Sequence, residues 1–352
     1  MRHGANIDPR NRFGGQSAVP DFEHWEMADD APELPADRRI EYLPDTSKSI
    51  VTENDSPDVP FRYSVNPYRG CVHGCAYCYA RPYHEFLGLS AGVDFETKVF
   101  VKHDAPALFG EFLSRDAWEP ELIAFSGITD CYQPAEREFQ VTRGCLRVAW
   151  ECRQPVGVIT KNALITRDLD VLRDMAALGL ARVSVSLTTL DAELARVMEP
   201  KTSTPAARLR AIAELSAAGV PVNTMVAPVI PGLNDSEIPG VLQAAKEAGS
   251  QTASYVLLRL PQSVEPVFRD WLRRTQPLKR QRVEGLIRGS REGRYNSSDF
   301  GRRMRGTGEV ARQIQSVFEV FAKKLGLDAS LPPPDSSQFR RPVAKSGQMR
   351  LF

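Results

Sequence analysis

Short apolar segments alternate with amphipathic segments along most of this chain, and that alternation restricts the fold more than any other feature. Two of the amphipathic segments, residues 168–178 and 204–217, repeat their leucines at helical spacing, and each is followed by a glycine suited to a helix C-terminus. Strands that alternate with helices form parallel βαβ units. The sequence predicts six strands, at residues 61–66, 121–126, 156–160, 182–187, 222–227 and 253–258.

Six βα units are too few for a closed eight-stranded barrel. We therefore expect an α/β fold built on a partial (β/α)6 TIM-type barrel, with its site at the carboxyl ends of the strands. The barrel would span residues 61–265. An irregular N-terminal extension (residues 1–60) would precede it, and a helical, basic C-terminal region (residues 266–326) and a loose tail (residues 327–352) would follow.

Charge and hydropathy exclude several classes of protein. The net charge of the 352-residue chain is +1, so any contact with nucleic acid must come from a local basic patch. Residues 1–60 contain no apolar core of a signal peptide, and no apolar run approaches the roughly 20 residues of a membrane-spanning helix. The sequence predicts a cytoplasmic protein with no membrane partner.

Three of the six cysteines, Cys71, Cys75 and Cys78, lie close together directly after the first predicted strand. Thiolates are soft ligands that suit iron–sulfur clusters or zinc. Gly70 and Gly74 relieve backbone crowding in the loop. Three cysteines would leave one iron of a [4Fe–4S] cubane without a protein ligand, and such an open position can bind and activate a small molecule.

Two other metal centres compete with this interpretation. A structural zinc ion would use His73 or His84 as its fourth ligand. A conventional ferredoxin cluster fits less well, because four cysteines usually close such a cluster.

The segment from Asn66 to Ala80, NPYRGCVHGCAYCYA, resembles the radical S-adenosylmethionine (SAM) superfamily, in particular the subgroup that contains spore photoproduct lyase. The resemblance covers residues 61–310, and its signature is CxxxCxxC with an aromatic residue, Tyr77, before the last cysteine. It implies a [4Fe–4S] cluster, SAM as a second cofactor, and a one-electron reductant of the flavodoxin or ferredoxin type. It also implies that a 5′-deoxyadenosyl radical abstracts hydrogen from a substrate, while the protein positions the cofactors.

The resemblance also assigns SAM-binding roles, to Tyr77 and to polar residues at the strand ends. After the second strand, Ser126, Thr129 or Asp130 would accept a hydrogen bond from the methionine amino group. The alternative is an ordinary turn capped by Asp130. After the third strand, Lys161 would pair with the methionine carboxylate, although a lysine in this position is more often solvated.

Ser186, in the fourth strand, matches a serine that the family places near the ribose or the carboxylate, and its alternative role is packing inside the barrel. Arg208 would form a bidentate carboxylate contact, or would be a surface residue of its helix. Residues 227–235 are similar to the family's adenine-contacting loop.

Tyr79 and Cys131 are the candidates for hydrogen transfer with the substrate, because spore photoproduct lyase uses a tyrosine and a cysteine in such steps. Tyr79 follows the last cysteine of the motif, and its alternative role is to shield the cluster from water. Cys131 follows Asp130, and its alternative is a buried, inert thiol.

The segment from Arg291 to Arg305 carries five arginines with Tyr295 and Phe300 among them. Such a segment can bind phosphates and stack on bases, so DNA or RNA is the first substrate class to test, and a solvated basic face is the alternative. The competing interpretation of the whole chain is a non-enzymatic zinc- or cluster-binding module that binds nucleic acid.

Overall fold

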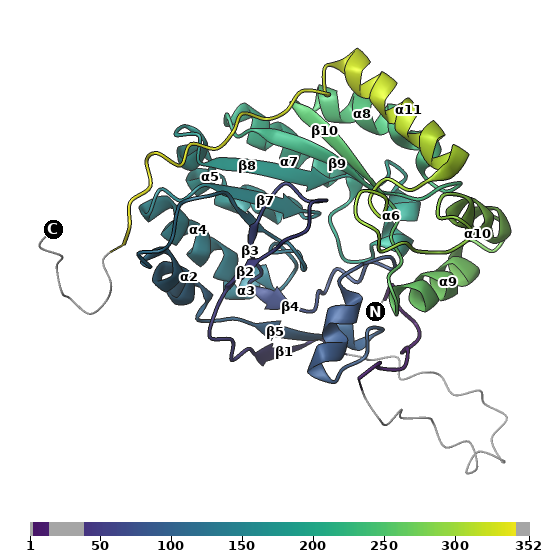
Figure 1. Cartoon of the computed structure of the whole chain (residues 1–352), viewed down its shortest axis with the longest axis horizontal. Helices are drawn as coiled ribbons and strands as arrows, with labels where there is room; N and C mark the ends of the chain where they lie inside the picture. Colours follow the sequence, from purple (N-terminus) through teal and green to yellow (C-terminus); the bar gives the residue numbers. More distant parts are fainter. Residues whose placement is uncertain (1–2, 14–38, 343–352) are drawn as a thin grey trace, which may run out of the picture.

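A curved sheet of seven strands forms the centre of the molecule. The computed structural model describes residues 3–13 and 39–342 (Figure 1). The strand order is β10-β9-β8-β7-β6-β3-β2, and every neighbouring pair is parallel except β2–β3. The strands are β2 (Val51–Glu53), β3 (Tyr63–Val65), β6 (Ile123–Phe125), β7 (Val156–Thr160), β8 (Ala181–Ser186), β9 (Val222–Val229) and β10 (Thr252–Leu257). All six predicted strands are present, and the prediction of a partial TIM-type barrel is confirmed.

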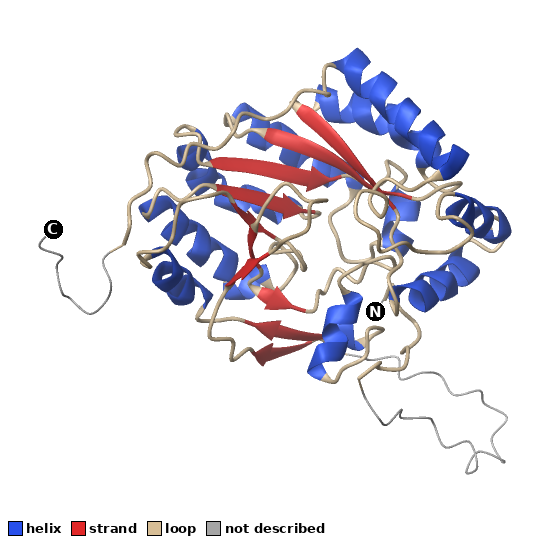
Figure 2. Ribbon diagram, in the orientation of Figure 1, coloured by secondary structure: helices blue, strands red, loops and turns tan. Residues whose placement is uncertain are grey.

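Helices cover the outer face of this sheet (Figure 2). Helices were predicted at residues 168–178 and 204–217 from their apolar residues, and these residues do face the sheet. Four of them are fully buried in the main core: Leu172, Met175, Ile212 and Leu215. The covering helices are α2 (Ala105–Leu113), α4 (Val141–Glu151), α5 (Leu169–Ala176), α7 (Pro205–Ala217) and α8 (Ile238–Glu247).

Local capping explains where α7 begins and ends. Pro205 occupies its first turn, and the side chain of Thr204 accepts a hydrogen bond from the backbone N–H of Ala207 at 3.3 Å. Gly219 follows the helix with φ of 80°, a left-handed conformation that favours glycine.

The remaining short helices lie in the connections between strands. They are η2 (Arg81–Leu87), α1 (Asp94–Thr97), α3 (Glu136–Phe139), η3 (Ala163–Asp168), α6 (Ala192–Met198) and η4 (Asp235–Glu237). Of these, η2 and α1 follow the cysteine loop, and α6 follows β8 at the carboxyl ends of the strands.

A second, three-stranded sheet was not predicted. Its order is β1-β5-β4, with strands β1 (Glu41–Pro44), β4 (Tyr68–Arg69) and β5 (Lys98–Val101). The expectation of an irregular segment over residues 1–60 is therefore wrong for β1 and β2, while residues 14–38 of that segment lie outside the described part. The strands are short and pair with distant segments, so local periodicity could not reveal them.

The described N-terminal residues 3–13 pack against the segment that carries the cysteines. Ala5 is buried, and its N–H donates to Glu96 Oε1 at 2.7 Å. A Cβ added at Gly4 would lie 1.8 Å from the carbonyl oxygen of Gly74, so the two backbones are in direct contact. Phe13 stacks on Phe86 with ring centroids 4.6 Å apart. We call residues 3–13 the N-terminal strap.

The C-terminal region is helical, as predicted, with α9 (Val264–Thr275), α10 (Arg280–Gly289) and α11 (Gly308–Leu325). The predicted loose tail is not loose over residues 327–342. Asp335 and Arg340 donate backbone hydrogen bonds to the carbonyls of Gly179 and Cys152, at 3.1 and 2.7 Å. These residues therefore pass the amino ends of β7 and β8, at the end of the barrel opposite the cysteines. The rest of the tail lies outside the described residues.

None of the helices in residues 3–13 and 39–342 has the length and hydropathy required to cross a bilayer.

The buried ion pair of Arg81 and Glu96 supports the first prediction. Both side chains are fully buried, at an N–O distance of 2.5 Å. Replacing Glu96 with Gln leaves the Arg81 charge without its counter-ion, which should lower the free energy of unfolding by about 3–5 kcal/mol. Urea unfolding of the full chain measures this change.

The exposed pair of Arg62 and Glu53 offers a matched control, because both side chains are more than half exposed. Glu53→Gln should cost at most about 1 kcal/mol. Equal, small losses from both substitutions would contradict the structural role assigned to Glu96.

Candidate active site

The cysteine loop lies at the carboxyl end of β3, and two glycines allow its tight path. Gly70 and Gly74 have φ of 77° and 62°. A Cβ at Gly70 would lie 2.8 Å from the carbonyl oxygen of Lys98, and one at Gly74 would lie 2.7 Å from Glu96 Oε2. Only glycine therefore fits at either position without a shift of the neighbouring atoms.

The three thiols of the loop are free and lie close enough to influence one another. Cys71 and Cys75 are buried and Cys78 is partly buried. Burial raises the pKa of each thiol, and the negative charge of a neighbouring cysteine raises the pKa of Cys71 and Cys75 further. Apolar contacts from Phe95 and Ile128 line the space around Cys71 and Cys78. Three converging thiols in a water-poor setting suit a cluster whose irons stabilise thiolates.

Neither histidine of this region is placed as a fourth ligand. His73 Nε2 lies 3.0 Å from the side-chain amide of Asn162, and Nδ1 lies 3.4 Å from Asp130 Oδ2. Burial lowers the pKa of His73 to about 4, so its ring is neutral at pH 7. The ring of His84 instead packs edge-on against Phe95, with centroids 5.7 Å apart.

Across residues 3–13 and 39–342, no three His, Cys, Asp or Glu side chains are placed to hold a single metal ion. A zinc tetrahedron would need its sulfurs drawn to about 2.3 Å from one point. A cubane binds each thiolate through a different iron and therefore accepts a wider spacing. Three such thiolates would leave one iron of a [4Fe–4S] cluster open.

The loop after β6 uses its polar side chains to hold its own backbone. Ser126 has φ of 77°, and its hydroxyl accepts from the N–H of Cys131 at 2.7 Å. The Thr129 hydroxyl donates to the carbonyl of Tyr68 at 2.8 Å. Asp130 accepts from the Thr160 hydroxyl and from the Lys161 N–H, both at 2.7 Å. The contacts of these three side chains match the turn alternative, and their contact with SAM stays a prediction.

Lys161 turns into the barrel instead of out to solvent. Its ammonium donates to Ser186 Oγ at 2.8 Å and to the carbonyl of Ala227 at 2.9 Å, and it lies 5.7 Å from the ring centre of Tyr77. Burial, together with the charge of Arg208, lowers the pKa of Lys161 to about 8. The structure thus brings Tyr77, Lys161 and Ser186 together, as the sequence predicted.

Glu199 joins this group to Arg208, and sequence reasoning did not identify it as a site residue. Its carboxylate is fully buried and accepts hydrogen bonds from the Tyr77 hydroxyl, Thr188 Oγ1 and Arg208 Nη2. It also lies 3.6 Å from the ammonium of Lys161. Burial raises the pKa of Glu199, while the neighbouring Arg208 opposes that rise. One carboxylate therefore balances two buried cations and fixes the hydroxyl of Tyr77.

Arg208 is 1% exposed, so the surface alternative is wrong. Besides Glu199, its guanidinium donates to the carbonyls of Ser186 and Ser203, at 3.0 and 2.8 Å. It also donates to the hydroxyl of Thr202 at 2.6 Å. The carboxylate that Arg208 contacts in this structure is therefore that of Glu199, and its contact with SAM stays a prediction.

Asn162 is a second residue that the sequence did not reveal. Its side-chain oxygen accepts from the N–H of Leu164 and from the hydroxyl of Ser203, both at 3.0 Å, while its amide faces His73. It therefore connects the cysteine loop to the loops after β7 and α6. Its position next to Lys161, just beyond the apolar strand β7, was the available signal.

The two residues predicted for hydrogen transfer have different environments. Tyr79 is 43% exposed, its hydroxyl donates to the carbonyl of Gly127 at 2.8 Å, and the guanidinium of Arg259 lies 5.8 Å from its ring centre. Cys131 has no exposed surface and belongs to the main apolar core. Tyr79 is thus at the open end of the barrel, whereas the surroundings of Cys131 match the inert-thiol alternative.

The loop at residues 227–235 is held by Asn234. Its side-chain oxygen accepts from the N–H of Ile230 at 2.6 Å, and its amide donates to the carbonyls of Thr188 and Pro228, at 2.7 and 3.0 Å. The loop therefore has a fixed shape beside Thr188 and Glu199. Its contact with adenine stays a prediction.

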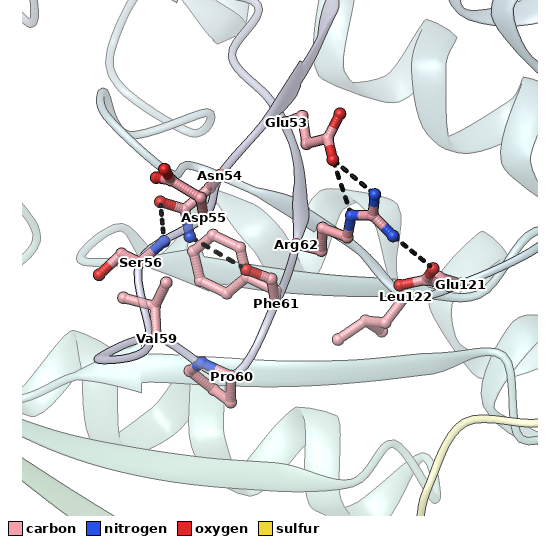
Figure 3. Close-up of a pocket in the computed structure, with 10 residues that line it drawn as sticks. All are labelled: Glu53, Asn54, Asp55, Ser56, Val59, Pro60, Phe61, Arg62, Glu121 and Leu122. Carbon is pink, nitrogen blue, oxygen red and sulfur yellow. Dashed lines mark hydrogen bonds and ion pairs between the residues drawn. The ribbon is translucent and has the colours of Figure 1, made fainter.

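An open hollow of about 560 Å³ lies at the opposite end of the strands, where β2 ends and β3 and β6 begin (Figure 3). Figure 3 shows Arg62 between Glu53 and Glu121, with N–O distances of 2.6 and 3.7 Å. Arg62 pairs with both of these glutamates, and none of the lining residues comes from the cysteine loop. We therefore place the chemistry at the carboxyl ends of the strands.

Comparisons with known proteins agree with this geometry. A family model described as the radical SAM superfamily matches residues 65–245. An uncharacterized protein of Mycobacterium bovis is 39% identical over 232 residues, which is 65% of this chain and 68% of that protein. An uncharacterized protein of Methanocaldococcus jannaschii is 26% identical over 199 residues, 56% of this chain and 71% of that protein.

Among solved structures, spore photoproduct lyase shares the fold. One mutant of that enzyme, with a cysteine replaced by serine, superposes with a TM-score of 0.59 at 16% identity, covering 81% of this chain and 78% of that chain. A double mutant with bound AdoMet and dinucleoside spore photoproduct has a TM-score of 0.56 at 17% identity, with the same coverage. At these identities the likeness concerns the fold alone.

The burial of the cysteines predicts an order of thiol labelling in the cluster-free protein. Cys78 is partly exposed, whereas Cys131 and Cys145 have no exposed surface and burial raises their pKa. A maleimide followed by peptide mass spectrometry should modify Cys78 first. It should reach Cys131 and Cys145 only on unfolding, when their thiols become accessible.

Cys78→Ser provides the control, because it should remove the fast phase of labelling and leave the slow phase unchanged. Rapid modification of Cys131 in the folded protein would contradict its placement in the core.

Proposed function

The chain belongs to the radical SAM superfamily, and from this premise we propose an enzyme that acts on a nucleic-acid substrate reaching its cofactors past Tyr79. The superfamily uses a [4Fe–4S] cluster and SAM. The observation that carries the proposal is the gathering of the cysteine loop, the Lys161 group and Tyr79 at one end of the barrel.

Cys71, Cys75 and Cys78 would hold the cluster, which when bound supplies the electron that cleaves SAM and yields the hydrogen-abstracting 5′-deoxyadenosyl radical. The residues around the loop exclude water and fix its shape. Tyr77 is held by Glu199, and Arg81 donates to the carbonyl of Cys75 at 2.8 and 3.1 Å. A one-electron reductant of the flavodoxin or ferredoxin type and a cytoplasmic location complete the proposal.

Lys161 is the residue that we assign to the methionine carboxylate of SAM. Two neutral oxygens, from Ser186 and Ala227, orient its ammonium without neutralising it, and Glu199 already pairs more closely with Arg208. The ammonium therefore keeps attraction for a second carboxylate. Ser186 would assist as a hydroxyl partner of that carboxylate or of the ribose.

Tyr79, in preference to Cys131, is our candidate for hydrogen exchange with the substrate. Its hydroxyl is at the open end of the barrel and next in sequence to Cys78, while Cys131 is enclosed by apolar side chains. A lyase-like reaction, in which hydrogen returns to the product, would require such an accessible donor.

A nucleic-acid substrate is supported by exposed aromatic side chains and by an arginine beside Tyr79. Tyr83, Phe86 and Phe300 are 52%, 66% and 58% exposed, and Arg259 lies over the Tyr79 ring. Exposed aromatic rings stack on bases, and arginines bind the backbone. The alternative of a non-enzymatic zinc module has less support, because the family match disfavours it.

The proposal predicts that substitutions can affect cluster assembly and the use of SAM separately. Anaerobically reconstituted protein, reduced with dithionite and mixed with SAM, should form 5′-deoxyadenosine, measured by mass spectrometry. Cys75→Ala should abolish both the cluster absorbance and the product. Lys161→Met should keep the cluster but raise the SAM concentration needed for half-maximal turnover about 10- to 100-fold, because a charged hydrogen bond is lost.

Lys324→Met on α11 is the matched control and should match the wild-type chain in both readouts. Absence of 5′-deoxyadenosine from a cluster-loaded protein would overturn the enzymatic proposal. An unchanged SAM dependence in Lys161→Met would overturn the role given to that lysine. Addition of single-stranded DNA or RNA should increase 5′-deoxyadenosine formation, and stimulation by neither would remove nucleic acid as the substrate class.

A further inference from the structure

Three arginines from separate parts of the chain meet at the carboxyl end of β10. Arg259 follows β10, Arg291 follows α10, and Arg303 belongs to the loop between α10 and α11. The N–H of Leu257 donates to the carbonyl of Met304 at 2.9 Å, which lays this loop along the end of β10. Arg291 Nη2 donates to the carbonyl beside Arg259, that of Leu258, at 2.6 Å. We call Arg259, Arg291 and Arg303 the arginine cluster.

The arginine cluster carries more positive charge than its carboxylate partners balance. Arg303 pairs with Asp58, whose side chain is 6% exposed. Arg259 forms no ion pair within the described residues, and its Nη1 donates to the sulfur of Met304, a weak acceptor, at 3.7 Å. Arg291 donates only to backbone carbonyls. Within the described residues, Asp58 therefore pairs with Arg303 and acts at longer range on Arg259, while Arg291 has no carboxylate partner.

Two further observations show that the described residues do not fully compensate this excess charge. The Nε atoms of Arg259 and Arg291 are buried and have no hydrogen-bond partner in the described parts of the chain. Burial and, to a smaller extent, the charge of Arg259 lower the pKa of Arg291 to about 10. Burial likewise lowers the pKa of Arg259, and the charge of Arg303 adds to this effect. Like charges held together at this cost favour the arrival of an anion.

The neighbours of the arginine cluster indicate what kind of anion would fit. Arg259 lies over the ring of Tyr79, and Arg303 lies 4.5 Å from the ring centre of Phe300. Both rings are substantially exposed, at 43% and 58%. Guanidinium groups match the oxygens of a phosphate in paired hydrogen bonds, and exposed rings beside them match the bases attached to it.

We propose that Arg259 and Arg303 form a phosphate-binding subsite at the mouth of the barrel, supported by Arg291, with Asp58 as the internal counter-ion that the phosphate replaces. The subsite rests on the proposed function, since its phosphate would belong to the nucleotide whose base or sugar lies beside Tyr79. Arg291 positions Arg259 through the Leu258 carbonyl and adds positive potential. The neighbouring Arg305 has a different role, since it packs over the ring of Tyr255 at 4.3 Å.

The test is binding of a fluorescein-labelled single-stranded oligodeoxynucleotide to the cluster-loaded full chain, followed by anisotropy at several salt concentrations. Neither SAM nor a reductant is added. Arg259→Gln should weaken binding at least about tenfold and reduce the slope of log affinity against log salt by about one. Arg259→Lys, which keeps the charge without the planar fork, should fall between Arg259→Gln and the wild-type chain.

Asp58→Asn is the opposing variant and should tighten binding, because it removes the carboxylate that competes for Arg303. Arg312→Gln is the surface control, since Arg312 is 74% exposed on α11, and its affinity should stay within about twofold of wild type. Thermal melts of each variant identify any loss that comes from unfolding. Wild-type binding by Arg259→Gln, or weaker binding by folded Asp58→Asn, would overturn the subsite.

Competition distinguishes the two sources of such a phosphate. Displacement of the probe by unlabelled oligonucleotide at far lower concentration than by a mononucleotide or inorganic phosphate supports a subsite for a nucleic-acid backbone. Equal displacement by the mononucleotide supports the same subsite for a free nucleotide. Displacement by none of the three would overturn it. Because the assay contains no SAM, its failure is distinct from a failure to form 5′-deoxyadenosine.

Discussion

Two buried carboxylates hold the cysteine loop through separate sets of contacts, and the geometry of the site depends on both. Glu199 binds the hydroxyl of Tyr77 and links it to Arg208 and Lys161 on the barrel side. Glu96 binds Arg81, which in turn binds the carbonyl of Cys75, and it also accepts the N–H groups of the N-terminal strap. Each carboxylate is fully buried, so each offsets its desolvation through several charged hydrogen bonds.

This arrangement gives one physical reason for several features of the chain. Gly4 permits contact between the N-terminal strap and the loop, because a Cβ there would clash with the backbone of Gly74, and a Cβ at Gly74 would clash with Glu96. Burial alone would raise the pKa of Glu96, but Arg81 and the hydrogen bonds from the strap lower it below its ordinary value. The ionised carboxylate therefore needs the strap close beside it. A loop held in this way can keep three thiols in place before a cluster binds, which reduces the ordering cost of binding.

The sequence predicted the parts of this protein that follow local rules, and missed those that depend on distant partners. Periodicity located all six parallel strands, and the cysteine motif located the loop at their carboxyl ends. Lys161 and Ser186 were found because their places at the ends of predicted strands match residues of the family that the chain resembles. Glu199 was missed as the centre of the network because nothing near it in sequence shows that Tyr77 and Lys161 fold onto it. The pairing of β1 with β5 and the docking of the N-terminal strap are likewise long-range contacts without a local pattern.

The most direct test of the account is an electron paramagnetic resonance spectrum of the anaerobically reconstituted, reduced protein, recorded with and without SAM. The account predicts a [4Fe–4S]⁺ signal whose g-values shift when SAM is added, because three thiolates leave one iron open to the cofactor. The same shift should be absent from a sample mixed with adenosine, which lacks the methionine part of SAM. A cluster signal that does not respond to SAM, or a protein that binds zinc and assembles no cluster, would contradict the account.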